Sequence, residues 1–134
     1  MANTKIAWDV IVLTEIGIKN HERGMYRLNG YNCIFATREE TSRGGGVCAF
    51  VKNSLDSTLS AFKCDVNDGV RVEIHVDAIN LVILGVYRQP CSNKNKFINE
   101  LKKLLRSKEN DVANLVLMGD INIDIMINNK IREN

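Results

Sequence analysis

Short apolar runs of strand length, with a single helical stripe among them, constrain the fold of this chain more than any other feature. Residues 8–16 form a run rich in β-branched side chains that contains Glu15, which is typical of a strand buried on both faces. Residues 17–30 are polar and glycine-containing, and predict a loop with room for one helical turn. Further strands are predicted at 31–37, 47–51 and 57–62.

A hairpin is predicted next. Residues 70–77 alternate between apolar and polar side chains, which indicates a strand with one buried and one solvated face. Residues 81–87 are apolar and follow a turn at Asn80, so the two runs form an antiparallel pair.

After Pro90 the apolar period becomes helical. The stripe predicts an amphipathic helix, capped by Ser92 or Asn93, and consists of Phe97, Leu101, Leu104 and Leu105. A last buried strand is predicted at 115–118. This order indicates an α/β or α+β fold with a mixed sheet, and no dinucleotide-binding or Walker sequence is present.

Composition excludes several classes of protein. The chain has 134 residues, 45% hydrophobic and 25% charged, which is typical of a globular protein and not of a disordered one. No apolar run approaches the roughly 18 residues that span a bilayer, and no secretory signal is apparent. The four cysteines form no C-x-x-C pair, so we expect reduced, mostly buried thiols without zinc or disulfides. The net charge of +2 neither requires nor excludes nucleic acid.

Polar side chains follow three of the apolar runs. Glu15 ends the first run, Tyr87 and Arg88 end the hairpin, and Asp120 and Asn122 follow the last strand, with Asp124 beyond them. Active sites of α/β proteins gather at the ends of strands, so these groups are predicted to share one rim of a sheet.

Such a set suits hydrolysis of phosphate esters. Carboxylates bind Mg²⁺, a second carboxylate activates water, and an amide and a phenol bind phosphate. The sequence Gly119-Asp120-Ile121-Asn122 also describes a turn in which Asp and Asn bond their own backbone, and this alternative stays open.

Four motifs in order resemble one family. The sequence is similar to the endonuclease/exonuclease/phosphatase superfamily, and within it to the endonuclease domain of non-LTR (LINE-type) retrotransposons. The similarity runs from about Ile6 to about Met126, and its motifs are Trp8–Glu15, Arg43–Val47, Val86–Pro90 and Leu117–Asp124.

The resemblance implies a mixed-sheet β-sandwich flanked by helices, and a role for each matching residue. Glu15 matches a metal-binding glutamate for Mg²⁺ or Mn²⁺, and Tyr87 a tyrosine at the scissile phosphate. Asp120 matches the aspartate that orients or activates water, and Asn122 the asparagine that holds the phosphate. Asp124 is assigned a cap or turn function without a catalytic role.

The resemblance also implies partners. DNA is the expected substrate, contacted through its phosphate backbone by Arg88 and Arg43, although both arginines could equally be solvated surface charges. A reverse transcriptase domain in the intact polyprotein and an intracellular, nuclear location follow from the same resemblance. No membrane partner is expected, because no apolar run is long enough to span a bilayer. The glycine triplet Gly44–Gly46 is expected to let the backbone turn tightly into the next strand.

The sequence departs from the family at both ends. A first strand ending in asparagine has no counterpart, and no histidine follows His75 to match the family's Ser-Asp-His motif. We therefore expect 1–134 to be a single partial domain, truncated at both ends, with open sheet edges and little turnover. Two alternatives are a non-catalytic nucleic-acid-binding or interaction remnant and a phosphatase or phosphodiesterase of the same superfamily.

Overall fold

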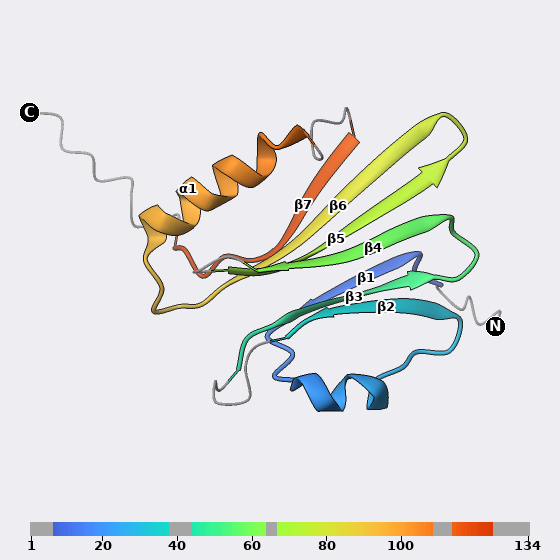
Figure 1. The fold of residues 1–134 in the computed structure, drawn as a ribbon, viewed down its shortest axis with the longest axis horizontal. Coiled ribbons are helices and arrows are strands. Elements are labelled where there is room, and N and C mark those ends of the chain that lie inside the picture. Colours follow the sequence, from blue (N-terminus) through green and yellow to red (C-terminus); the bar gives the residue numbers. More distant parts are fainter. Residues whose placement is uncertain (1–6, 38–43, 64–66, 109–113, 125–134) are drawn as a thin grey trace, which may run out of the picture.

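Two β-sheets stack face to face in the computed structural model, which describes residues 7–37, 44–63, 67–108 and 114–124. Figure 1 shows the two layers, with the helices of the described residues outside them. The strands are β1 (Val10–Thr14), β2 (Tyr31–Ala36), β3 (Val47–Lys52), β4 (Ser57–Lys63), β5 (Asn67–Val76), β6 (Ile79–Arg88) and β7 (Asn114–Asp120). The helices are η1 (Asn20–Met25) and α1 (Lys94–Leu105).

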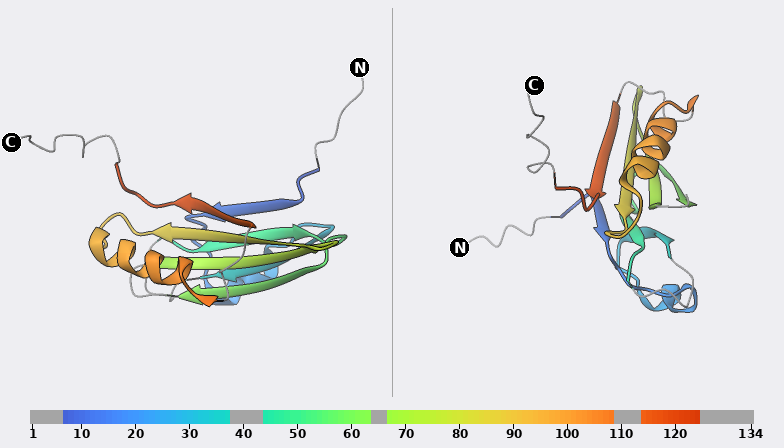
Figure 2. Two further views of the ribbon diagram at one scale, coloured as in Figure 1. Left: turned by 90° about the horizontal axis from the view of Figure 1, so that it is seen from above. Right: turned by 90° about the vertical axis from the view of Figure 1, so that its left-hand side faces the viewer.

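The two sheets differ in strand direction. The first has the order β1-β3-β2 and is antiparallel throughout. The second has the order β4-β5-β6-β7, in which β6 and β7 run parallel because α1 carries the chain back between them. Figure 2 shows α1 lying along the outer side of this sheet. The prediction of an α+β fold with a mixed-sheet sandwich is confirmed.

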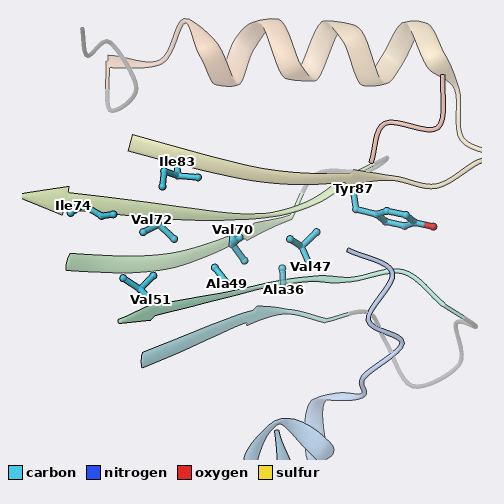
Figure 3. Packing of buried hydrophobic residues seen from close by; sticks show 9 residues of the cluster. All are labelled: Ala36, Val47, Ala49, Val51, Val70, Val72, Ile74, Ile83 and Tyr87. Carbon is cyan, nitrogen blue, oxygen red and sulfur yellow. The ribbon is translucent and has the colours of Figure 1, made fainter. Parts of the chain in front are cut away.

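The core fills the space between the sheets. Its side chains come from the inward positions of the strands, and Figure 3 shows the buried cluster Ala36, Val47, Ala49, Val51, Val70, Val72, Ile74, Ile83 and Tyr87. Tyr87 lies at the end of this row, with its hydroxyl directed away from the aliphatic side chains. The core therefore holds the ring of Tyr87 and leaves its polar end at the rim.

Strand β6 is buried on both faces. All residues from Val82 to Arg88 are buried, because sheet one covers one face and α1, with the buried Phe97, covers the other. The predicted cap of α1 is confirmed at Asn93, whose side chain accepts a hydrogen bond from the Lys96 backbone N–H at 3.0 Å. Within the described residues, neither helix is long and apolar enough to cross a membrane.

The expected burial of residues 8–16 on both faces is wrong, and so is the expected burial of the strand at 115–118. In the described part of the chain, β1 and β7 each pair with one strand and lie at the ends of their sheets. Apolar side chains on them are between 39% and 47% exposed, namely Leu13, Val116, Leu117 and Met118. Apolar composition indicated a strand, but its burial depends on neighbours that a single segment does not specify.

The cysteines differ in environment. Cys48 is buried in β3, Cys33 is partly buried and Cys91 is exposed, while Cys64 lies outside the described residues. All three described thiols are free, as expected, but the expectation that they are mostly buried fails for Cys91. Burial raises the pKa of the Cys48 thiol to about 11, since desolvation disfavours the thiolate.

We expect thiol reagents to distinguish Cys48 from Cys91 in the native protein. Because the thiolate is the reactive form, the raised pKa alone slows Cys48 by about 10²-fold relative to an ordinary thiol. Labelling at mildly alkaline pH, mapped by mass spectrometry, measures both rates, and concentrated guanidinium chloride supplies the unfolded control. Equal labelling of both thiols in the native state would contradict the buried position of Cys48.

Candidate active site

The ends of β1, β6 and β7 meet at one rim of the sandwich. The Tyr87 hydroxyl donates a hydrogen bond to Glu15 Oε1 at 3.1 Å, which brings together residues 72 positions apart. Asp120 is the register partner of Tyr87 in the parallel β6–β7 pair, so the two side chains leave adjacent strands at the same level. The predicted convergence of Glu15, Tyr87 and Asp120 is therefore observed.

The segment after β7 is a tight turn. Asp120 Oδ1 accepts a hydrogen bond from the Asn122 backbone N–H at 2.9 Å, which is the Asx geometry left open by the sequence. The Asn122 side-chain amide donates to the Arg88 carbonyl oxygen at 2.7 Å. The turn and the candidate site are therefore compatible, because the same residues form both. Asp120 uses one carboxylate oxygen to hold the turn, and the turn holds Asn122 beside β6.

The prediction that Arg88 contacts the DNA backbone is wrong. Arg88 is fully buried. Successive side chains on a strand point to opposite faces, so Tyr87 turns toward the inter-sheet core and Arg88 toward the side that carries α1. Its guanidinium donates its hydrogen bonds to oxygen atoms of the protein, including the Ile121 and Asn122 carbonyl oxygens, each at 2.7 Å. Arg43 lies outside the described residues, and its expected DNA contact stays a prediction.

A hollow of about 330 Å³ opens beside the rim. Glu15 and Tyr87 form part of its wall, and the remaining lining residues are Gly44, Gly45, Gln89, Pro90 and Cys91. Its size lies in the range of small-molecule sites, large enough for a phosphodiester group. Only their position after a strand end could have indicated Gln89 or Cys91 as lining residues in advance.

The glycine loop closes one side of this hollow. Gly44, Gly45 and Gly46 all have positive φ, between 72° and 87°, so the triplet turns the backbone into β3 as predicted. A Cβ on Gly46 would approach the Ala36 carbonyl oxygen to 3.1 Å. The Gly45 carbonyl accepts from the Gly17 N–H at 3.0 Å, which ties this loop to the segment that follows Glu15.

Backbone strain concentrates at the candidate site. Within the described residues, three non-glycine residues have positive φ: Glu15 at 57°, Asp77 at 52° and Asn122 at 48°. Asp77 lies in the β5–β6 turn, where aspartate tolerates the left-handed region. A glutamate has no such preference, so the conformation of Glu15 is held by its surroundings, a pattern that clusters at functional sites.

Asp68 is a buried acid that the sequence interpretation missed. It is 5% exposed and pairs in register with Tyr87, so Asp68, Tyr87 and Asp120 occupy one row across β5, β6 and β7. The alternation of Val70, Val72 and Ile74 continues backward to position 68. The sequence feature that could have identified Asp68 is therefore a carboxylate at a position on the apolar face of β5.

The carboxylates of the site could supply only part of the coordination shell of a magnesium ion. Within the described residues, no group of three or more Asp, Glu, His or Cys side chains is arranged to hold a metal. Mg²⁺ commonly binds through one or two carboxylates and keeps several waters, and Glu15 is an exposed carboxylate that fits this requirement. The donor set is compatible with Mg²⁺ and does not form a closed cage.

Neither histidine is placed at the Tyr87 end of β6. His75 contacts Asn80 Oδ1 at 2.8 Å through Nδ1, at the start of β6, whereas Tyr87 lies near the end of that strand. His21 lies in η1. The described part of the site therefore consists of carboxylates, a phenol, an amide and backbone groups.

We expect Glu15→Gly to be more stable than Glu15→Ala by about 1 kcal/mol, since only glycine adopts positive φ without a Cβ penalty. Both variants lose the bond to Tyr87, so their difference isolates the backbone strain. Urea unfolding measures it, and the matched pair Thr14→Gly and Thr14→Ala, one residue earlier in β1, should show the opposite order. The same order at both positions would contradict strain at Glu15.

We expect Gly119→Ala to destabilise the fold by at least about 2 kcal/mol. Gly119 has φ 136°, and a Cβ there would lie 1.9 Å from the Val86 carbonyl oxygen, so β7 must move away from β6. Gly24→Ala is the control, because a Cβ on Gly24 meets nothing within 4 Å. Equal unfolding midpoints for the two variants would contradict the close approach of β7 to β6.

Comparison with known proteins supports the fold. No protein-family model matches the sequence, and no curated protein matches it. Among solved structures, the endonuclease domain of TRAS1, a telomere-specific non-LTR retrotransposon, superposes with a TM-score of 0.56 at 17% identity, covering 74% of this chain and 44% of that domain. Caenorhabditis elegans TDP2 superposes with a TM-score of 0.58 at 12% identity, covering 87% of this chain and 50% of TDP2.

A third similar structure is ANGEL2, a 2′,3′-cyclic phosphatase. It has a TM-score of 0.54 at 16% identity, with 85% of this chain and 40% of ANGEL2 covered. The chain thus spans half or less of the length of these three proteins. At these identities the likeness concerns the fold, which an endonuclease domain and a cyclic phosphatase have in common. This chain has the endonuclease/exonuclease/phosphatase fold.

Proposed function

We propose that this chain is part of a metal-dependent, DNA-nicking endonuclease domain of a retrotransposon, and that residues 1–134 form a single partial domain of it. The observation that carries the proposal is the meeting of Glu15, Tyr87 and Asp120 at one rim, with Glu15 in a strained backbone conformation. The structural similarity to the TRAS1 endonuclease domain supports it, as does the similarity to D. rerio TDP2 complexed with a single-strand DNA product, at a TM-score of 0.54 and 12% identity.

Each residue has a role that its position allows. The exposed Glu15 carboxylate would hold Mg²⁺ or Mn²⁺, which when bound supplies charge stabilisation at a phosphoryl oxygen. The Tyr87 hydroxyl donates its single O–H to Glu15 Oε1 at 3.1 Å, and it would turn this donor to a phosphate oxygen when a substrate binds. Asp120 would orient or deprotonate the attacking water with the oxygen that the turn does not use. The Asn122 amide donates one N–H to the Arg88 carbonyl and would hold the phosphate with the other.

Turnover by this chain is proposed to be slow. General acid–base groups each contribute about 10²–10⁴-fold, and neither His21 nor His75 takes that role in the described site. This observation favours a second candidate, a non-catalytic nucleic-acid-binding domain that keeps the fold. A reverse transcriptase partner in an intact polyprotein and a nuclear location belong to the retrotransposon proposal.

The deciding experiment is relaxation of supercoiled plasmid. With Mg²⁺ or Mn²⁺ the wild-type chain is expected to nick the plasmid slowly, and Asp120→Ala to be slower by at least about 10²-fold. EDTA should abolish cleavage, and Asp77→Ala, in the remote β5–β6 turn, is the matched control expected to retain the wild-type rate. Equal cleavage by wild type and Asp120→Ala would remove Asp120 from the mechanism.

A second measurement does not depend on turnover. Cys91 lines the hollow beside Glu15 and Tyr87, so an oligonucleotide bound there with Mg²⁺ should slow alkylation of this exposed thiol. Protection of Cys91 without cleavage supports the binding-domain candidate. Hydrolysis of small phosphoesters or cyclic phosphates without plasmid nicking would instead favour a phosphatase, as in ANGEL2.

A further inference from the structure

Arg88 is a buried cation with an unusual set of partners. Every hydrogen bond of its guanidinium goes to a backbone carbonyl or a hydroxyl, and among the described residues it pairs with no carboxylate. A charge buried without a counterion is unfavourable unless its donors are fully used. The fork of N–H groups on arginine is suited to such use, since it reaches several acceptors in fixed directions.

The partners of Arg88 fall into two loops. Nε and Nη2 donate to the carbonyl oxygens of Ile121 and Asn122, in the turn that contains Asp120. Nη1 donates to the carbonyl oxygens of Gln89 at 2.8 Å and Ser92 at 2.6 Å, in the loop that lines the hollow. One side chain thus connects two walls of the candidate site.

Residues in both of these loops make further hydrogen bonds that support the contacts of Arg88. The Asn122 side chain donates back to the Arg88 carbonyl at 2.7 Å. The Ser92 hydroxyl accepts from Arg88 at 3.0 Å and donates to the Gln89 carbonyl at 2.8 Å. These bonds set the course of the backbone around Asn122, a residue held at φ 48°.

We propose that Arg88 is a positioning residue: its buried guanidinium holds the 120–122 turn against the 89–92 loop and so fixes Asp120 and Asn122 relative to Tyr87. Arg88 lies on the face of β6 opposite to Tyr87 and contacts no substrate. The effect on the reaction rests on the proposed function, whereas the effect on the two loops does not.

Arg88→Lys is the first test, because lysine keeps the charge and lacks the fork. Hydrogen bonds to charged groups are strong enough that their loss should speed amide exchange in 119–124 and 89–92 by about tenfold or more. Exchange in β3 should stay unchanged. In plasmid nicking we expect kcat to fall about 10- to 100-fold with KM for DNA within about threefold, as for misplaced catalytic groups.

Arg71→Lys is the matched control. Arg71 lies on β5 and donates to Glu73 on the same strand at 2.6 Å, so its replacement should leave exchange in 119–124 and the rate of nicking unchanged. Arg88→Met provides a second variant if Arg88→Lys fails to fold, because it removes the buried charge together with its donors. Guanidinium at low concentration should restore part of the lost kcat in Arg88→Ala and leave wild type unaffected.

Unchanged exchange in 119–124 on replacement of Arg88 would overturn the proposal, as would faster exchange with an unaltered kcat. If the wild-type chain cleaves nothing, the proposed function fails, while the exchange measurement still decides whether Arg88 holds the two loops. If wild type nicks DNA and Arg88→Lys matches it in both exchange and kcat, the proposed function stands and the role of Arg88 is refuted.

Discussion

The parallel pairing of β6 with β7 is the constraint on which the rest of the site depends. It places Asp120 beside Tyr87 in register, and it requires the glycine at position 119, where a side chain would collide with the Val86 carbonyl. Since α1 makes the crossover between these strands, the amphipathic stripe of that helix also contributes to the site. The apolar face of α1 and the carboxylate of Asp120 therefore belong to one structural unit.

The rim combines backbone strain with hydrogen bonds between residues far apart in the sequence. Glu15 and Asn122 adopt left-handed backbone conformations, and the bonds from Tyr87, Arg88 and Asp120 hold them there. Such conformations persist where their surroundings over-determine them, and a rigid arrangement of this kind costs no reorganisation when a charged ligand arrives. The fold alone does not imply this chemistry, because an endonuclease domain, that of TRAS1, and a 2′,3′-cyclic phosphatase, ANGEL2, are both similar to it.

Much of the fold was accessible from local pattern. Alternation along 70–76 predicted the inward and outward faces of β5, and the stripe through Phe97 predicted α1 and its cap at Asn93. Polar residues at the ends of apolar runs predicted that Glu15, Tyr87 and Asp120 would meet. These inferences succeeded because strand and helix periodicity are local properties of the chain.

The sequence by itself determined the strands, the helix and the identity of the polar groups at their ends. Only the tertiary structure decided where those groups point. Arg88 follows Tyr87 by one residue and therefore faces the opposite side of the sheet, where backbone carbonyl oxygens accept its hydrogen bonds. Tertiary structure also decided that β1 and β7 lie at the ends of their sheets in the described part of the chain, and that Asp68 joins the row of Tyr87. Burial and partnership depend on which strands become neighbours, and that choice is made by long-range packing rather than by any one segment.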